Sequence, residues 1–588
     1  MSKFIFLLLI IEIVTQTNNF PSLEDNSHKL NLTEIPSVNY TNSIKWIGFS
    51  LSSPYIITKI IWSFKDNFTQ NQLLGIFEGS NEPSFNDSIP LYIFKEESSI
   101  NCIQIESKSS FQYIRYVSPL KKDILIKNIE VYGYIPKEEQ NEDKYYQPTN
   151  IPLIIVNSEG KINYTDKEEK TLCNIIIINN GKISTKQTGT IKLRGNSSKN
   201  FDKKPFQITL DKKERILGMP AKAKKWVLLS NHADKTLLRN LVSFKISSLL
   251  GQKYSPACEP IDLILDGSFE GNYIICDKIE KGEARVELDS MDENCNDYPE
   301  ITGGYLMEID ARADEEEFHF TSKKGVKVTI KYPDTNQNQT NYIKKWFDEI
   351  EENIYSNKNI DNIDLETSSQ YFILEEFCAD VDSVFSSYYI TKQRNDDKMY
   401  FGPAWDFDLA LDNDWRLYPT NKKEKWIFNY GGSSGTFRQF ISKLVSYEDT
   451  LNAIQQKWKD VTINNLTKEK VLDFIEEKIT YLNESIKLNF KRWDVLNKNV
   501  MNEPVTRGSY EEEIKYLKEF IKERFIVFGN MVLNSHLSNI NTNITINIYD
   551  NINNNNSSLE AKEDRINQNI YFHVRISLVI LIIILILG

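Results

Sequence analysis

The chain has 588 residues, of which 40% are hydrophobic, enough for two or three domains with buried cores. Its formal net charge of −12 and its scattered lysines and arginines give no basic surface for nucleic acid, which we exclude as a partner. The five histidines are widely separated and show no metal-ligand or triad spacing, which argues against a zinc hydrolase.

Both ends of the chain carry apolar segments. Residues 1–18 combine an early lysine with a long apolar run, the pattern of a secretory signal peptide. Residues 576–588 are almost entirely apolar and resemble a GPI-attachment signal, with a short membrane-spanning anchor as the alternative. We therefore expect a route through the secretory pathway to the cell surface or the extracellular space, with membrane contact through the C-terminal anchor. N-glycosylation sequons that fit this topology include Asn31, Asn39, Asn67, Asn163, Asn465 and Asn483.

The cysteines are even in number, which is compatible with disulfides, but they form no Cys-x-x-Cys pair. Their spacing leaves the connectivity open. Cys378 lies in an apolar helical pattern and fits a buried thiol. The six are Cys102, Cys173, Cys258, Cys276, Cys295 and Cys378.

Residues 30–135 consist of short alternating apolar segments separated by turn residues, without a long helical period. This pattern predicts a β-sandwich. Three of its segments, GIFEGSNEPSF (75–85), FQYIRYVSP (111–119) and IEVYGY (129–134), resemble the discoidin or F5/8 type C family. The resemblance implies a module that binds a glycan or a surface ligand through its loops, with a purely structural sandwich as the alternative.

A second, larger domain is expected over residues 151–535, after a polar linker at 136–150. It mixes strand and helix patterns, and helical periods at 437–451, 468–488 and 510–533 predict a C-terminal helical part. The Asn-rich segment 536–575 lacks the apolar residues of a core and is expected to be a stalk and spacer. The expected fold class is α+β.

Two strand patterns, 188–194 and 204–210, flank a polar loop of small residues, Gly195–Lys203. Backbone N–H groups in such a loop are suited to cradle an anion. Side chains alternate between the two faces of a strand, and this alternation puts Lys204 on the apolar face of the second strand. An inward-facing ammonium needs an anionic partner, which a phosphate supplies, whereas a lysine reaching solvent at the strand end is the alternative.

A helical apolar pattern over Leu365–Ala379 is followed by Asp382. Two short strand patterns then predict a hairpin, which leads into GPAWDFDLALDND (402–414), where Asp406 and Asp408 alternate with apolar side chains. The chain thus has one acid at a helix end, then a hairpin, and then a pair of acids. Protein kinases place the catalytic-loop and magnesium-binding aspartates in this order. A solvated acidic loop is the alternative.

Six segments in this order resemble the CotH kinase family, relatives of the bacterial spore-coat protein H. They are LRGNSSKNFDKKPFQITLDKK (193–213), ILGMPAKAKKWVLLSNHADKTLLRN (216–240), PIDLILDGSFEGNYIICDKIE (260–280), GGYLMEID (303–310), ADVDS (379–383) and GPAWDFDLAL (402–411). The resemblance implies a two-lobed atypical protein-kinase-like domain after the β-sandwich module, using ATP with Mg²⁺ or Mn²⁺. The implied site residues are Asp382 as catalytic-loop acid, Asp406 and Asp408 as metal ligands, and Arg194, Ser197 and Lys204 at the nucleotide.

The chain departs from ordinary kinases in several motifs. It has no Gly-x-Gly-x-x-Gly loop and no His-Arg-Asp, and Ser387 stands where the metal-binding asparagine is usual. The helix expected over Lys235–Leu250, with Asp234 as its N-cap, carries no glutamate to pair with Lys204. The candidate partners elsewhere are Glu280 and Glu308.

Three functions follow from these patterns. The first is a secreted or surface-anchored atypical serine/threonine kinase acting on Ser or Thr of secretory-pathway or surface proteins. The second is an inert surface adhesin in which the kinase-like domain is a scaffold. A glycosidase using two of the acids is the third, although no carboxylate spacing selects it.

Overall fold

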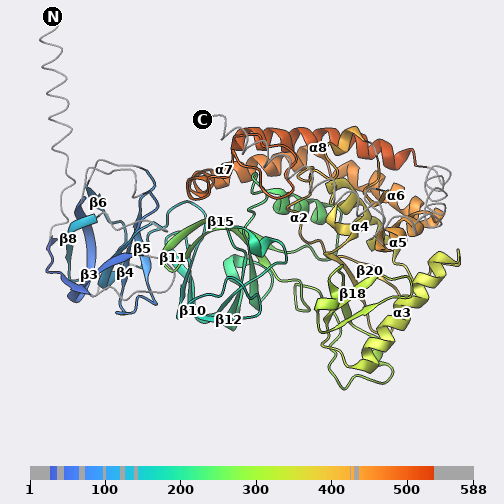
Figure 1. The fold of residues 1–588 in the computed structure, drawn as a ribbon, viewed down its shortest axis with the longest axis horizontal. Coiled ribbons are helices and arrows are strands. Elements are labelled where there is room, and N and C mark those ends of the chain that lie inside the picture. Colours follow the sequence, from blue (N-terminus) through green and yellow to red (C-terminus); the bar gives the residue numbers. More distant parts are fainter. Residues whose placement is uncertain are drawn as a thin grey trace, which may run out of the picture.

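The computed structural model describes residues 27–35, 45–64, 73–96, 101–119, 126–137, 143–423, 425–429 and 436–535. The expected signal peptide, stalk and C-terminal apolar segment lie outside the described residues, as do Asn39 and Asn67. An all-β part, a barrel and a mixed part with the helices follow one another along the longest axis (Figure 1). Among the described residues, no helix combines the length and the apolar character needed to cross a bilayer.

The N-terminal part is built only of strands in the residues described, as predicted for 30–135. They form one connected sheet in the order β1-β8-β3-β7-β4-β5, with β2 and β6 also paired to β3. The 19-residue β3 allows this, because its first half pairs with β7 and its second half with β8. A division into two packed sheets stays a prediction. The strands are β1 His28–Lys29, β2 Thr33–Ile35, β3 Trp46–Phe64, β4 Ile76–Ser80, β5 Ile89–Ile93, β6 Cys102–Gln104, β7 Ser110–Val117 and β8 Ile126–Tyr134.

Seven strands then close into a barrel in the order β10-β11-β12-β13-β15-β14-β9, with β9 and β14 parallel. In β10, Ile175 and Ile177 point into the barrel core, whereas Ile176 and Ile178 pack outward against the N-terminal strands. This run of isoleucines is therefore buried on both faces. The strands are β9 Leu153–Ser158, β10 Thr171–Asn179, β11 Lys182–Leu193, β12 Phe206–Glu214, β13 Ala223–Leu229, β14 Cys258–Leu265 and β15 Ser268–Asp277.

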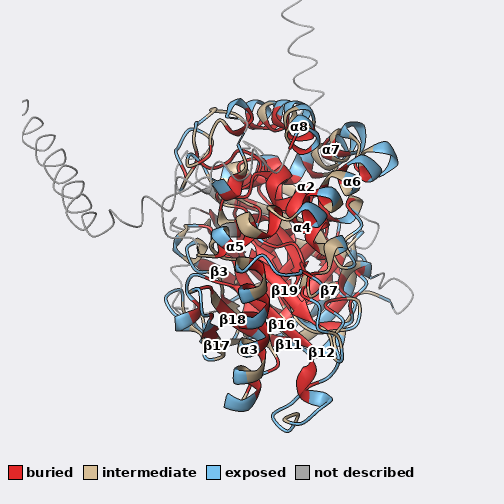
Figure 2. Ribbon diagram, turned by 90° about the vertical axis from the view of Figure 1, so that its right-hand side faces the viewer, coloured by how far each residue is buried: buried red, intermediate tan, exposed pale blue. Residues whose placement is uncertain are grey.

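The remaining chain forms a five-stranded sheet in the order β17-β18-β16-β19-β20 and a group of helices. Figure 2 shows α2 and α4 buried inside, whereas α6, α7 and α8 expose their outer faces. The predicted hairpin is confirmed, since β19 and β20 pair antiparallel. The strands are β16 Tyr305–Ile309, β17 His319–Thr321, β18 Lys327–Tyr332, β19 Tyr388–Lys392 and β20 Tyr400–Phe401. The helices are α2 Arg239–Leu249, α3 Gln337–Tyr355, α4 Leu365–Cys378, α5 Thr436–Val445, α6 Glu448–Asn464, α7 Lys468–Arg492 and α8 Tyr510–Leu533.

Helix α4 confirms the helical pattern predicted before Asp382. Its N-cap Asp364 accepts a hydrogen bond from the Thr367 backbone at 2.8 Å. At its other end Ala379 adopts a left-handed backbone with φ 56°, which stops the helix. The acidic segment that contains Asp382 therefore begins directly after the end of α4.

The predicted start of α2 was wrong. The helix begins at Arg239 and not at Lys235, and the position before it, Leu238, makes no side-chain cap. Asp234 instead accepts hydrogen bonds from the backbone of Thr236 at 2.9 Å and of Arg239 at 2.8 Å, and from the Arg239 guanidinium at 2.6 Å. An aspartate that bonds a backbone N–H two residues ahead favours a turn over a helix, which delays the helix start.

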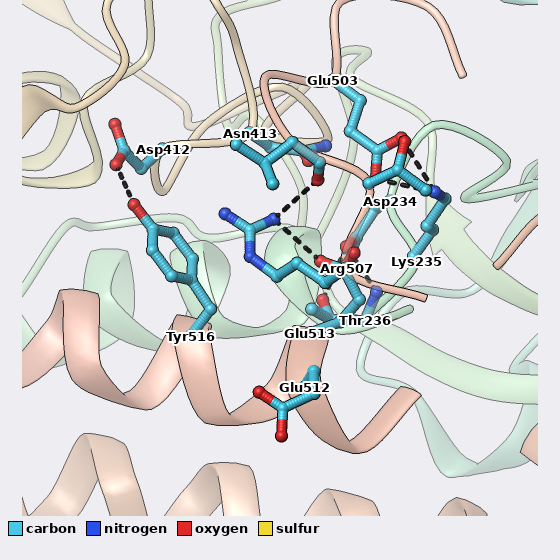
Figure 3. Close-up of polar contacts among 12 residues, drawn as sticks. Asp234, Lys235, Thr236, Asp412, Asn413, Glu503, Arg507, Glu512, Glu513 and Tyr516 are labelled. Carbon is cyan, nitrogen blue, oxygen red and sulfur yellow. Dashed lines mark hydrogen bonds and ion pairs between the residues drawn. The ribbon is translucent and has the colours of Figure 1, made fainter. Parts of the chain in front are cut away.

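The segment between α7 and α8 is tied to this turn by a buried ion pair, Lys235 with Glu503 (Figure 3). The Nζ–Oε1 distance is 2.7 Å, and both side chains are only 2% exposed. Lys235 also donates to the Lys498 carbonyl at 2.7 Å. Nearby, Arg507 pairs with Glu513 at 3.2 Å. The Lys235 contacts fasten the connection between α7 and α8 onto the turn before α2, whereas the Arg507 pair joins this connection to α8.

Lys235→Ala is expected to lower the free energy of unfolding by about 3–5 kcal/mol, because it leaves Glu503 buried without its counter-ion. The matched control is Lys515→Ala, which breaks the exposed pair with Glu512 and is expected to cost less than about 1 kcal/mol. Urea unfolding of both variants checks this, and equal losses would contradict it.

Candidate functional site

A cleft of about 450 Å³ lies where the barrel, the five-stranded sheet and the loops after α4 and β20 meet. Its lining comes from the loop after β11, the residues just after β15, strands β16 and β18, and the segments around residues 382 and 406. The fold thus brings together five of the six residues singled out in the sequence. They are Arg194, Ser197, Asp382, Asp406 and Asp408.

Lys204 is the sixth, and it does not line the cleft. Its Nζ donates to the backbone carbonyl of Lys199 at 2.9 Å, so its ammonium is bound within its own loop. The two glutamates considered as its partners pair with other cations. These pairs are Glu308 with Lys331 at 3.0 Å and Glu280 with Arg285 at 2.5 Å.

The turn that carries Asp406 and Asp408 is anchored on α2. The rings of Trp405 and Phe407 lie 6.2 and 6.1 Å from the ring of Phe244, and both side chains are buried. The backbone N–H of Phe407 also donates to the Asn240 Oδ1 at 2.8 Å. Because the apolar side chains face α2, the alternating acids are left to the cleft.

Asp406 has a left-handed backbone with φ 69°, an uncommon conformation for a non-glycine residue. It is exposed to the cleft, yet protein on its other sides desolvates it and raises the pKa of its carboxyl. Arg194 opposes this rise, whereas the charges of Asp382 and Glu308 add to it. A strained backbone beside crowded charges is typical of functional sites.

Asp408 experiences a stronger repulsion. Burial, followed by the charges of Asp406, Asp382 and Asp234, raises the pKa of the Asp408 carboxyl well above its ordinary value. In the part of the chain that the structure describes, neither Asp406 nor Asp408 has a lysine or arginine ion-pair partner. The pair therefore lacks a counter-cation, although Arg194 lies close enough to reduce the repulsion at Asp406.

Asp382 is held differently from the other two acids. It begins a short 3₁₀ turn, Asp382–Val384, and its Oδ1 accepts from the Arg416 Nη2 at 2.7 Å. The same Nη2 donates to Asp414 Oδ2 at 2.6 Å, and the Arg416 Nε donates to Asp414 at 2.9 and 3.0 Å. Asp414 is buried, whereas Asp382 is 40% exposed. Arg416 thus fixes one oxygen of Asp382 while the residue lines the cleft.

Cations line the cleft as well. The Arg194 guanidinium lies 5.4 Å from the centre of the Trp405 ring. Lys278, directly after β15, lines the cleft near other lysines, and burial together with these charges lowers its pKa to about 8 despite Glu280. Lys331 is paired with Glu308 at 3.0 Å. These cations suit a polyanionic ligand such as a nucleotide phosphate chain.

The acids of the cleft also fit a divalent cation that shares its ligands with a phosphate. Mg²⁺ is commonly bound by one or two carboxylates together with substrate phosphates. Asp406 and Asp408 supply such a pair without a protein counter-ion. No ready-made group of three or more His, Cys, Asp or Glu ligands is present in the described ranges, so the phosphates and water would have to complete the shell.

Sequence reasoning missed Lys278, Lys331 and Arg416. A signal for Lys278 was present, because Ile274 and Cys276 alternate on the apolar face of β15 and Lys278 continues this alternation one residue beyond the strand end. Arg416 lies just beyond the quoted acidic segment, and only the fold shows that it reaches back to Asp382.

Three comparisons with known proteins bear on this site. The model of the family described as CotH kinase protein matches residues 191–526, more than half of the chain. No curated protein matched. Among solved structures, the chain is similar to CBM62 from Clostridium thermocellum Xyl5A, with 18% identity, covering 20% of this chain and 98% of that chain, at a TM-score of 0.15. That likeness carries no argument about the N-terminal part.

Asp408→Asn is expected to stabilise the protein at pH 7 by about 1 kcal/mol, because it removes a carboxylate that its neighbours repel. The advantage should shrink as the pH falls toward about 4, the ordinary pKa of an unfolded aspartate, because the folded Asp408 is then protonated in the parent as well. Melting temperatures across this range check it. Asp414→Asn, at a buried acid paired with Arg416, is the control and should destabilise at pH 7.

Proposed function

Because the chain belongs to the CotH kinase family, we propose that it is a protein kinase that transfers the γ-phosphate of ATP to serine or threonine hydroxyls. The observation that carries the proposal is the meeting of Arg194, Ser197 and three aspartates in one cleft. Phosphoryl transfer requires positioning and charge stabilisation at such a cleft, with cations on the phosphates and an acid at the acceptor hydroxyl.

The nucleotide phosphates would bind on the barrel side of the cleft. The loop after β11 contributes backbone N–H groups, and Gly195 has φ 89°, a conformation that favours glycine. Arg194 and Lys278 come from this side with charges suited to phosphate oxygens. We assign to Lys278, and not to Lys204, the role of the phosphate-binding lysine, because only Lys278 lines the cleft.

The three aspartates of the cleft would have different roles because their surroundings differ. Asp406 and Asp408 would hold Mg²⁺ or Mn²⁺, which when bound neutralises charge on the phosphate chain. Asp382 would accept the hydrogen bond of the acceptor hydroxyl and orient its oxygen. The Arg416 guanidinium supports this role, since it holds one Asp382 oxygen at 2.7 Å and limits rotation of the carboxylate.

The proposal also covers where the protein acts. From the terminal segments and sequons we propose a location in the secretory pathway and at the cell surface, with secretory or surface proteins as acceptors. A glycan or surface ligand on the N-terminal part and a two-lobed kinase layout belong to the same proposal. Release from cells by phosphatidylinositol-specific phospholipase C tests the GPI anchor.

Asp406→Asn and Asp382→Asn are expected to fail in different ways. Loss of Asp406 should weaken magnesium-dependent ATP binding, because a metal ligand is removed. Loss of Asp382 should leave ATP binding largely intact and lower phosphate transfer by about 10²-fold or more, because the acceptor hydroxyl loses its partner. Calorimetric titration with Mg-ATP, paired with labelled phosphate incorporation into a serine-rich acceptor, separates these outcomes. If the parent bound no nucleotide, the cleft would be a scaffold feature and the adhesin function would replace this proposal.

Lys278→Met is expected to raise the KM for ATP by about 10-fold or more, since a charge-assisted contact to phosphate is lost. Lys204→Met is the matched control: it removes the same charge from a side chain that bonds the Lys199 carbonyl outside the cleft lining. Its KM should stay within about twofold of the parent. If Lys204→Met raised the KM for ATP and Lys278→Met did not, Lys204 would be the phosphate-binding lysine.

A further inference from the structure

Two of the six cysteines face each other across neighbouring strands of the barrel. Cys258, the first residue of β14, and Cys276, near the end of β15, are direct partners in the antiparallel register. Both are thiols in this structure. Directly opposite residues point to the same face of a sheet, so the two sulfur-bearing side chains lie side by side.

The backbone hydrogen bonds between β14 and β15 show whether Cys258 and Cys276 are a hydrogen-bonded or a non-hydrogen-bonded pair. The backbone N–H of Asp277 donates to the Ala257 carbonyl at 2.9 Å, so the neighbouring pair, Ala257 with Asp277, is the hydrogen-bonded one. Pairs alternate along an antiparallel ladder, which makes Cys258 and Cys276 a non-hydrogen-bonded pair. Such pairs have Cα atoms about 4.5 Å apart, within the range of about 4.4–6.8 Å found for disulfides.

The other strand cysteines have no such partner. Cys102 faces Ile61, and Cys173 lies between Ser158 and Gly189. Cys258 is partly exposed, which gives a reagent access, whereas Cys276 is buried in the core shared with α2 and α4. Cys276 also lies two residues before Lys278, which directly follows β15, so a link here would fix the strand end next to the cleft lysine.

We propose that Cys258 and Cys276 form a redox site that closes to a disulfide under oxidising conditions and joins β14 to β15 beside the cleft. The inference stands on strand register and does not depend on the kinase proposal. The oxidant it requires is a disulfide compound such as oxidised glutathione.

The chemistry proceeds by two exchanges. The Cys258 thiolate attacks one sulfur of oxidised glutathione, forming a mixed disulfide and releasing one glutathione thiolate. The Cys276 thiol then loses its proton, its sulfur attacks the Cys258 sulfur, and the second glutathione thiolate leaves. Overall, two protein thiols lose two electrons and two protons, and one glutathione disulfide is reduced to two thiols. Burial and the neighbouring Cys258 raise the pKa of the Cys276 thiol, so the second step is expected to be the slower.

The test incubates the full chain with oxidised glutathione, blocks remaining thiols with iodoacetamide after denaturation, and maps peptides without reduction. The expected result is a cross-linked peptide pair containing Cys258 and Cys276. The melting temperature should rise by on the order of 3 °C and return to its starting value with dithiothreitol. Alkylation of both cysteines to the same extent as in untreated protein, or a link from either one to a different cysteine, would overturn the proposal.

Two variants sharpen the result. Cys276→Ser removes the resolving sulfur, so Cys258 should accumulate as a stable mixed disulfide with glutathione. Cys102→Ser changes a strand cysteine that faces isoleucine, and it should leave the cross-link and the temperature shift unchanged. Because the peptide map of the parent is the primary measurement, poor folding of a variant does not prevent a decision.

Discussion

The candidate site depends on one constraint: carboxylates that repel one another must be held together on a short turn. The backbone bond from Phe407 to Asn240 and the packing of Trp405 and Phe407 on Phe244 meet it. Apolar burial of two aromatic side chains offers several kcal/mol in all. That is enough to offset the left-handed backbone of Asp406 and the charge repulsion beside it.

The closed barrel positions the side of the cleft that carries Arg194 and Lys278. Arg194 follows β11 and Lys278 follows β15, and these two strands are separated by β12 and β13. A closed barrel has no unpaired edge, and its interior is filled by side chains, so strand ends keep their mutual positions. Cations far apart in the chain can therefore lie in one cleft with little loss of conformational entropy on binding a ligand.

The N-terminal strands are joined to this support. Ile176 and Ile178 of β10 contribute to the core of the N-terminal part, and Ser88 bonds Asn157 of β9 at 3.3 Å. A shared apolar core resists relative motion more than a polar interface does. The N-terminal part and the barrel therefore share one buried apolar cluster.

The sequence alone identified features set by local spacing. Helix α4, the β19–β20 hairpin and strands β11 and β12 could be predicted because apolar periodicity and turn residues act over a few neighbours. The resemblance to the CotH kinase family pointed to Arg194, Ser197, Asp382, Asp406 and Asp408, which the fold gathers in one cleft, and to Lys204, which does not line it.

Other features depended on side-chain hydrogen bonds and packing that apolar periodicity does not encode. Helix α2 starts later than predicted because the Asp234 side chain accepts hydrogen bonds from the Thr236 and Arg239 backbones. A helical apolar pattern does not show that such side-chain hydrogen bonds compete with those of the helix. Lys204 donates a hydrogen bond to the Lys199 carbonyl, whereas Lys278 lines the cleft. Arg416 donates to Asp382, which lies 34 residues earlier in the chain. Periodicity assigns a residue to a face of its own element, whereas only tertiary packing decides what that face meets.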